Sequence, residues 1–218
     1  SSKGNIEHQD FNNMDGSLSA SYFLPTSELH ASGSFKNQDQ YLYGYNHDLL
    51  KPDAKDILHA FQKMETSIGY KNTAQNAWGL NYHPVLGYRS FKLKDSLEEK
   101  TIHAELPVDM MVFNSWKVAL NMSAEQTSIL QKRYTLSDTT VSNNLYQIKP
   151  FVSYKTSLFT AGIGAVLAQD RGQWRYLPEL SFVMPLKDTS LLVRAGVHSM
   201  VKQNTYQTLS SENPFLLS

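Results

Sequence analysis

Polar and apolar residues alternate with a period of two along most of this chain. The segment 114–125 illustrates the pattern, because Trp116 and Met122 fall on one parity. Lys117 and Glu125 fall on the other parity. Successive side chains of an extended strand point to opposite faces, so the pattern predicts a strand with one apolar and one polar face. Helical periodicity is nearly absent, and the chain is therefore expected to be all-β.

The same alternation recurs often enough to predict ten strands. Their apolar positions span residues 18–24, 29–35, 64–70, 78–88, 102–110, 116–124, 146–154, 159–167, 176–186 and 191–197. Each stretch has, or nearly has, the ~9 to 11 residues that a tilted strand needs to cross a bilayer. The sequence contains no run of about 18 apolar residues that would form a transmembrane helix. Any membrane role would therefore depend on β-structure.

Two features run against this assignment. Residues 51–64 contain apolar positions that would also form one face of a short helix, which is the alternative at the start of the third strand. Five prolines fall inside predicted strands, where each removes a ladder hydrogen bond and normally indicates an edge or a bulge. They are Pro84, Pro107, Pro150, Pro178 and Pro185. The sequence alone does not explain how all five are accommodated.

The spacing between the predicted strands alternates between short and long. Short connections follow the odd-numbered strands, and longer polar connections follow the even-numbered ones. An up-and-down outer-membrane barrel has tight turns on its periplasmic rim and longer loops on the other rim. A soluble β-sandwich shares the alternation of side chains but has no reason to share this spacing. The spacing favours a barrel, with binding specificity expected in loops 41–56 and 131–143.

Charged side chains on the polar parity are expected to face a water-filled lumen. The candidates are Lys63, Glu65, Arg89, His103, Glu105, Asp109, Lys117, Lys149, Glu179 and Arg194. They mix both signs, whereas a dedicated anion or cation pore would be biased toward one. Mixed charges fit a general hydrated pore, a lumen that holds a plug through ion pairs, or a wall whose charges pair across strands.

Aromatic residues near the strand ends predict two girdles at the membrane interfaces, where one end of the ring is apolar and the other is polar. The candidates are Tyr41, Tyr43, Trp78, Tyr88, Trp116, Tyr154, Trp174 and Tyr176. Trp78 and Trp116 fall near the short-turn rim, and Tyr41 and Trp174 fall near the long-loop rim. The alternative is that these are ordinary strand-end aromatics, as in any β-protein.

Composition removes several classes of function. The 20 basic and 20 acidic residues give a net charge of zero, so nothing favours nucleic-acid binding. Cysteine is absent, which excludes thiolate nucleophiles and zinc-thiolate sites. No two of the seven histidines lie within four residues of each other, and no Gly-x-Ser-x-Gly motif occurs. We expect no enzymatic activity, no cofactor and no metal site.

One long segment resembles a known family. The sequence GIGAVLAQDRGQWRYLPELSFVMPLKDTSLLVRAGVHSMVKQNTYQTLSSENPFL, residues 162–216, resembles the barrel region of Bacteroidetes-type outer-membrane proteins that are TonB-dependent-receptor-like. NTYQTLSSENPFL is its most characteristic part, and a weaker similarity of pattern extends over most of the chain. The resemblance implies a β-barrel in the bacterial outer membrane concerned with uptake or envelope assembly. The chain departs from the family in showing no plug domain, no TonB-box-like segment and no final strand that ends in an aromatic residue.

These observations combine into one expectation. Residues 1–218 form a single β-barrel region, an antiparallel up-and-down transmembrane barrel of about ten strands that belongs to a larger barrel. It would form the wall of a TonB-dependent-receptor-like transporter or porin for nutrient uptake. The alternative is a structural or accessory outer-membrane barrel within an envelope assembly or secretion machine. A soluble carbohydrate-binding or protein-binding sandwich is the third reading. The expected partners are membrane lipids, lipopolysaccharide and outer-membrane or surface lipoproteins, without nucleic acid.

Overall fold

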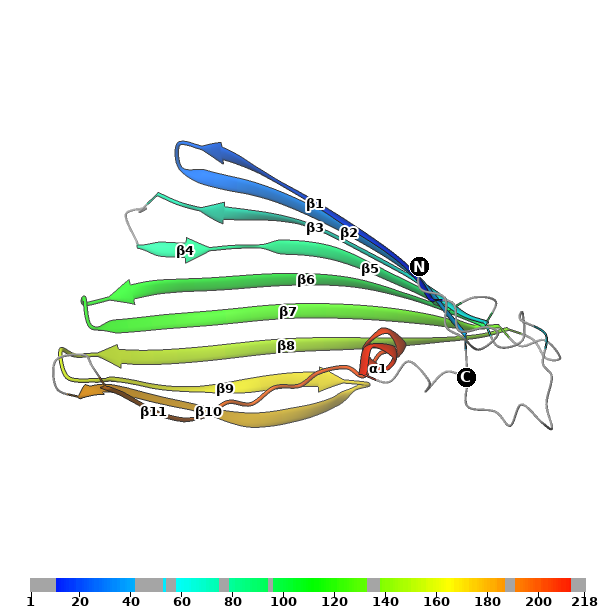
Figure 1. Ribbon diagram of the computed structural model, residues 1–218. Helices are drawn as coiled ribbons and strands as arrows, with labels where there is room; N and C mark the ends of the chain where they lie inside the picture. The colour runs from blue at the N-terminus through cyan, green and yellow to red at the C-terminus, as the bar shows by residue number, and fades with distance from the viewer. Residues whose placement is uncertain are drawn as a thin grey trace.

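The strands of this protein form one antiparallel sheet (Figure 1). The computed structural model describes residues 11–41, 53, 58–74, 79–93, 96–132, 138–186 and 191–212. The elements are β1 (Phe11–Leu24), β2 (Ser27–Tyr41), β3 (Leu58–Asn72), β4 (Leu80–Tyr82), β5 (Val85–Leu93), β6 (Leu97–Val112), β7 (Trp116–Gln131), β8 (Thr139–Lys155), β9 (Thr160–Asp170), β10 (Gln173–Leu186), β11 (Leu191–Val197) and α1 (Tyr206–Glu212). The expectation of an all-β chain is confirmed.

The sheet has the up-and-down topology that the sequence predicted. Its order is β1-β2-β3-β5-β6-β7-β8-β9-β10-β11, and β4 pairs with β6 beside β5. Because β4 and β5 pair with β6 in one continuous register, they are a single interrupted strand, the fourth of the ten predicted. The sheet curves into an open trough, and β1 and β11 are not paired with each other in the described part of the chain (Figure 1).

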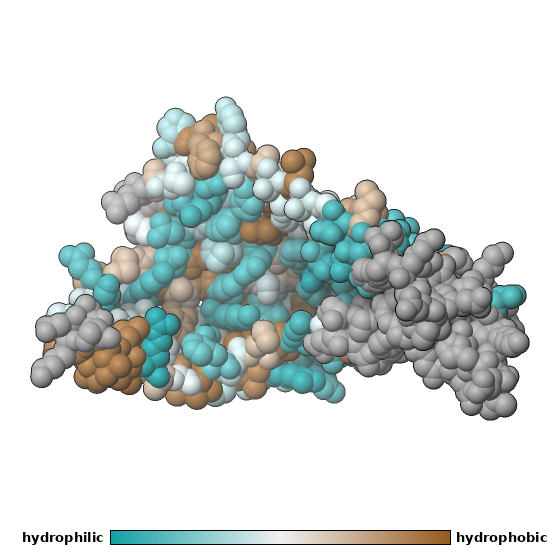
Figure 2. Space-filling model, viewed as in Figure 1, coloured by the Kyte–Doolittle hydropathy of each residue, from teal (hydrophilic) through white to brown (hydrophobic). Residues whose placement is uncertain are grey.

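The pairing register places the apolar residues of neighbouring strands side by side on the same face of the sheet. Leu120 of β7, for example, lies opposite Val108 of β6 and Pro150 of β8. The convex side of the trough is therefore apolar, and it stays exposed. Leu18 is 79% exposed, Ile163 65% and Tyr176 70%. A continuous exposed apolar surface of this kind needs a non-aqueous neighbour. The concave side is largely hydrophilic (Figure 2).

The apolar surface forms a belt with the height of a bilayer core. On β6 the belt runs from Ile102 to Met110. At ~3.3 Å per residue this is about 26 Å, close to the ~25 Å apolar band of outer-membrane barrels. Beyond Ile102 the same face carries Lys100 and Glu98, so the belt ends there while the strand continues to Leu97.

The strand segments beyond the belt are called the polar extension. It comprises residues 97–101 of β6, 126–131 of β7 and 139–145 of β8. These segments remain fully paired, as in the run of pairs from Gln126↔Asn144 to Gln131↔Thr139. The end of the sheet that carries the polar extension is the extension rim, and the opposite end is the turn rim.

The expected long connections are wrong at two places on the extension rim. Only residues 94–96 separate β5 from β6, and only residues 171–172 separate β9 from β10. The polar residues assigned to long loops are mostly strand residues that continue the ladder beyond the belt. The predicted loop 131–143 is also partly strand, because β8 begins at Thr139. The predicted loop 41–56 lies almost wholly outside the described residues.

The turn between β9 and β10 has a specific backbone geometry. Arg171 and Gly172 have positive φ angles of 48° and 79°. Two consecutive residues with positive φ are typical of a type I′ turn, whose twist matches that of the flanking strands. Glycine at the second central position is the sequence signal that identifies this turn as tight.

Two of the five prolines lie at one break in the sheet. Pro84 falls in the gap between β4 and β5. Pro107 of β6 faces that gap, since its carbonyl accepts a hydrogen bond from the backbone N–H of His83 at 3.1 Å. The N–H group that Pro107 lacks would have pointed to the same side. The break in one strand therefore accommodates the proline of its neighbour.

The other three prolines also lie where a ladder is incomplete. The β8–β9 pairing omits the position of Pro150. Pro178 lies beyond the last β10–β11 pair, and Pro185 lies beyond the last β9–β10 pair. Each missing N–H group therefore coincides with a place where a neighbouring strand offers no regular partner.

The third predicted strand is confirmed. β3 pairs with β2 from Asn72 to Leu58 and with β5 over nine residue pairs. The helix alternative is therefore wrong for residues 58–64. Residues 51–52 and 54–57 lie outside the described residues. No helix in the described part of the chain is long and apolar enough to cross a membrane.

An aromatic row lies on the convex face at the turn rim. Trp116 and Tyr154 are cross-strand partners whose ring centroids are 4.7 Å apart. The row continues through Phe159, 6.4 Å from Tyr154, to Phe182, 5.8 Å further on. The placement of Trp116 and Tyr154 at this rim agrees with an interfacial girdle.

The remaining aromatic candidates fall into two groups. Trp174 and Tyr176 are exposed and follow the tight turn at the extension rim, and Tyr88 lies opposite Ile102 at the upper edge of the belt. Tyr41 ends β2. Tyr43 and Trp78 lie outside the described residues, so their place in a girdle stays a prediction.

An arginine substitution on either side of β7 tests the assignment of the two faces. Met122 lies opposite Leu106 at the middle of the belt, whereas Asn121 points to the polar face and donates a hydrogen bond to Glu105. In lipid vesicles, Met122→Arg should lower the free energy of unfolding by ~2 to 4 kcal/mol, and Asn121→Arg should lower it by less than about 1 kcal/mol. Guanidinium titration of the vesicle-inserted protein measures both values. Equal losses would contradict the face assignment.

Candidate functional site: the polar face of the sheet

The charged residues expected to face a lumen share one face of the sheet. Register places them all on the concave side, at the parity opposite to that of the apolar belt. They are Lys63, Glu65, Arg89, His103, Glu105, Asp109, Lys117, Lys149, Glu179 and Arg194. Figure 2 looks onto this face, where hydrophilic side chains run across the middle of the trough. That this face lines a lumen remains a proposal.

Several of these charges pair with one another. Nη2 of Arg89 lies 2.6 Å from Oε2 of Glu125, so this pair reaches from β5 across β6 to β7. Lys117 and Asp109 join β7 to β6 at 3.1 Å. All four side chains keep part of their surface in contact with solvent, so each pair contributes little net stability. Pairing does, however, fix where the charges lie.

Other polar contacts extend this network. Lys63 and Glu65 pair along β3 at 3.0 Å. Asn121 donates a hydrogen bond to Oε1 of Glu105 at 2.8 Å. Glu179 lies 3.5 Å from Nδ1 of His198. Neither Lys149 nor Arg194 forms an ion pair within the described part of the chain. Of the alternatives drawn from the sequence, pairing across strands matches most of these contacts.

A polar cavity of about 710 Å³ lies on this face. One side presents serine hydroxyls of β1 to β3, among which Ser32 and Ser67 are hydrogen-bonded at 2.8 Å. The other side presents Glu65, Arg89 and Glu125. The cavity therefore offers hydroxyl groups on one wall and charges of both signs on the other, which suits water or a polar solute.

Two histidine rings lie close against glycines of the neighbouring strand. His30 faces Gly69 and His103 faces Gly87 in the register. A Cβ atom at either glycine would collide with the facing ring. Glycine is needed at both positions because the histidine ring approaches the backbone too closely for a side chain. The ring of His83 also lies close to this group, with its centroid 4.9 Å from that of His30.

Residues 198–212, called the strap, lie across the polar face. Near its start, Ser199 donates a hydrogen bond to the carbonyl of Pro178 in β10 at 2.6 Å. The side chain of Gln147 in β8 donates to the carbonyl of Val201 at 3.2 Å. Further along, Thr127 of β7 donates to the side chain of Gln203 at 3.4 Å. The strap therefore contacts β10, β8 and β7 in turn as it crosses the trough.

The strap ends in α1, which is anchored on β3 and β6. The backbone N–H of Tyr206 donates to Oε2 of Glu99 at 2.7 Å. The side chain of Gln207 donates to Oε1 of Glu65 at 2.8 Å. Thr205 caps the helix, because its hydroxyl accepts a hydrogen bond from the N–H of Thr208 at 3.1 Å.

An apolar cluster holds α1 at the extension rim. Tyr206 packs against Phe91, Leu93 and Leu97, together with partly buried Phe61 and Ile129. These apolar side chains all occur at polar-face parity and outside the belt. They are therefore the sequence signal that a further segment covers this part of the face. The polar sequence that follows β11 would suit a loop, but residues 198–212 pack on the sheet instead.

Polar side chains beneath the strap are buried. Glu99 is 2% exposed, and Thr101 and Thr127 are hydrogen-bonded to each other at 3.0 Å. Burial raises the pKa of the Glu99 carboxyl, while hydrogen bonds from the backbone of Tyr206 and Gln207 act in the opposite direction. Glu99 lies in the polar extension, outside the apolar belt. The hydrogen bonds satisfy a carboxyl that would be costly to bury alone.

No group of three or more histidine, aspartate or glutamate side chains in the described ranges is arranged to hold a metal ion.

Comparison with known proteins does not assign this chain to a family. No family model matches the chain, and no curated protein matches it. Among solved structures, the chain is similar to the crystal structure of the beta domain of the Bordetella autotransporter BrkA, at 9% sequence identity. The match covers 79% of this chain and 84% of that chain, with a TM-score of 0.22. A likeness this distant carries no inference, and none of these findings supports a TonB-dependent receptor or a Bacteroidetes origin.

A methyl group added at Gly87 tests the close approach of His103. Gly87→Ala should lower the free energy of unfolding by about 1 to 3 kcal/mol, because the ring must be displaced. Gly33→Ala is the matched control, since the nearest atom to its added Cβ is 3.9 Å away, and it should stay within about 0.5 kcal/mol of the parent. Denaturant titration gives both values. The double variant Gly87→Ala/His103→Ser should recover most of the loss; a loss that persists would contradict the collision.

Cross-linking tests the docked position of the strap. The chain contains no cysteine, so two introduced thiols react without background. The variant Glu65→Cys/Gln207→Cys should be cross-linked within the molecule by a short bis-maleimide, because these side chains are in contact. Glu179→Cys/Gln207→Cys is the control and should not cross-link, since Glu179 is on β10 near the start of the strap. Intact-protein mass spectrometry detects the link. Equal yields from both variants would show that the strap is undocked.

Proposed function

We propose that this chain forms part of the wall of an outer-membrane β-barrel transporter, in which the concave polar face lines the passage. The observation that carries this proposal is the belt from Ile102 to Met110, which has the height of a bilayer core and faces away from a polar surface. The alternation of exposed apolar and polar faces is the one a lipid-spanning barrel needs.

The soluble sandwich is less consistent with this arrangement. A sandwich buries its apolar faces between two sheets, which pack about 10 Å apart. All the described strands instead belong to one sheet, and its apolar side chains remain exposed. Lipid would cover this face without requiring a second sheet.

The polar face supports a restricted passage better than a wide open pore. In ion pairs such as Arg89–Glu125 the charges neutralise each other, whereas an open pore would present them to solutes. The strap also occupies the extension-rim end of the trough, so the polar cavity of about 710 Å³ lies beside an obstruction. A TonB-dependent-receptor-like transporter would need such an occupied lumen, while a porin would need it open. We therefore favour gated import over free diffusion as the transport mechanism.

The alternative is an accessory barrel that transports nothing. The mutual pairing of the polar-face charges favours it, because a wall whose charges satisfy each other needs no solute to do so. Such a barrel would hold partner outer-membrane proteins or surface lipoproteins. The two functions share the membrane-spanning wall and differ in whether a solute crosses.

The intact mass of the native polypeptide tests the wall. The edges of β1 and β11 are unpaired in the described part of the chain, and unpaired backbone groups are costly in lipid. We therefore expect peptides of this sequence in the membrane fraction, from a detergent-extracted protein well above 24.7 kDa. A soluble species close to that mass would contradict the barrel.

Solute flux into liposomes that contain the extracted native protein separates the two functions. Uptake of small polar solutes that rises when the strap is displaced by Tyr206→Ala supports a gated passage. Tyr206 is the strap side chain that packs on the apolar cluster, so its loss should release the strap. Liposomes that stay impermeable with both proteins would favour the accessory barrel.

A further inference from the structure

We propose that the convex face carries a binding site for a phosphate-bearing glycolipid, with one acyl chain in a groove that extends from β2 to β8 and the phosphate at Lys92 and Lys100. This inference rests on the proposed membrane-spanning wall and adds a lipid-binding site to it.

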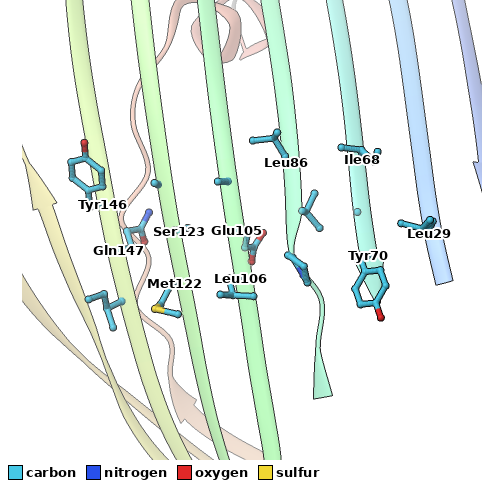
Figure 3. A pocket seen from close by; sticks show the side chains of 16 residues that line it. Leu29, Ile68, Tyr70, Leu86, Glu105, Leu106, Met122, Ser123, Tyr146 and Gln147 are labelled. Carbon is cyan, nitrogen blue, oxygen red and sulfur yellow. The ribbon is translucent and has the colours of Figure 1, made fainter. Parts of the chain in front are cut away.

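The groove is a hollow of about 730 Å³ in the apolar belt. Its floor contains two alanines, Ala104 and Ala124, which face each other across β6 and β7. Longer side chains surround this floor, including Ile68, Leu86 and Met122 (Figure 3). Small residues between larger ones leave a channel in the surface, and its lining is almost entirely apolar.

The depth of the groove matches a hydrocarbon chain. Ala104 lies two residues below Ile102, the upper edge of the belt, and Leu106 lies at the belt's middle. The groove is therefore within the part of the surface that a bilayer core would cover. A flexible acyl chain can follow a narrow channel, whereas another protein would need a complementary ridge there.

A cluster of charged residues lies directly above the groove on the same face. Oε1 of Glu98 is 2.9 Å from Nζ of Lys100 and 3.4 Å from Nζ of Lys92. One carboxylate between two ammonium groups leaves one positive charge in excess. Because both ammonium groups approach the same oxygen atom, they are close enough together for one phosphate to contact both. Each lysine keeps about half of its side-chain surface exposed, 52% for Lys92 and 53% for Lys100.

One strand ladder connects the lysines to the groove. From the groove upward, β5 and β6 pair Leu86 with Ala104, and then Ser90 with Lys100. The four residues from Ala104 to Lys100 span about 13 Å at ~3.3 Å per residue. A headgroup at Lys100 would therefore place the outer part of its acyl chain in the groove.

The position of Tyr146 agrees with this orientation. Tyr146 lines the groove on β8, and its hydroxyl points toward the end of the sheet where α1 lies (Figure 3). That end is the extension rim, where Lys92 and Lys100 are found. Tyrosine at the boundary between hydrocarbon and headgroups typically keeps its ring in the apolar layer and its hydroxyl in the polar one.

The extension rim indicates which lipid would bind. It carries the polar extension of β6, β7 and β8, whereas at the turn rim β6 and β7 are joined by residues 113–115 alone. In outer-membrane barrels the end of the sheet with the longer segments beyond the membrane faces outward. The outer leaflet contains phosphorylated, acylated glucosamine lipid, so lipid A is the occupant to which we commit. A phospholipid shares the phosphate and the acyl chain and is the competing source.

Native mass spectrometry of the membrane-extracted protein tests the site. The protein is exchanged into phosphatidylcholine nanodiscs that contain a small fraction of either lipid A or phosphatidylglycerol, and lipids that stay bound after release are counted. The double variant Lys92→Gln/Lys100→Gln removes the charges, and Ala104→Phe fills the groove. The controls are Lys155→Gln, an exposed lysine at the turn rim, and Ala195→Phe, an exposed alanine of β11 outside the groove.

The expected result is retention of lipid A in preference to both phospholipids by the parent and by the two controls. Both site variants should weaken that retention at least about tenfold, since each surface lysine attracts anionic lipid and the groove holds the chain. Unchanged retention in either site variant would overturn the site while leaving the wall intact. Preferential retention of phosphatidylglycerol would overturn the choice of lipid A. A parent protein that does not enter nanodiscs would instead overturn the membrane-spanning wall itself.

Discussion

The requirement that every backbone N–H and C=O group in an apolar layer has a hydrogen-bond partner governs this structure. In the proposed membrane wall, lipid would supply no partners, so the strands would have to supply them to one another. The ladders run without interruption through the belt except where a proline occurs. The placement of Pro107 opposite the gap between β4 and β5 follows from that requirement, since the missing donor and the missing partner coincide. The sheet tolerates the loss because both defects occupy one position.

Much of the sheet could be predicted from the sequence because side-chain parity is a local property. The alternation along 116–124 is enough to identify β7 and its apolar face without knowledge of its neighbours. The ends of the strands at the extension rim could not be found in this way. Residues 126–131 and 139–145 lie beyond the belt, so their positions on the convex side lose the apolar signal while the ladder continues. Strand pairing there is a non-local property that no single segment reveals.

The polar-face residues show the same difference between what is local in the sequence and what depends on strand pairing. Parity alone places Arg89 and Glu125 on one face, but their contact across β6 depends on the registers of two ladders. The strap is harder still, because its contacts with β3 and β6 join residues more than one hundred positions apart in the chain. The informative clue was the occurrence of Phe91 and Leu97 at polar parity, which is anomalous for a wet surface. Apolar residues on the wrong parity indicate that another segment covers them.

The strap also has a mechanical consequence. Its described contacts begin with Glu179 and Pro178 of β10 and reach Glu65 of β3, so it crosses the hollow of the sheet from one side to the other. An antiparallel sheet bends readily about axes parallel to its strands, because rotation at each ladder is small and cumulative. A segment of fixed length that is anchored at both ends limits how far β10 and β3 can separate. The radius of the trough is therefore set in part by a segment that belongs to none of its ladders.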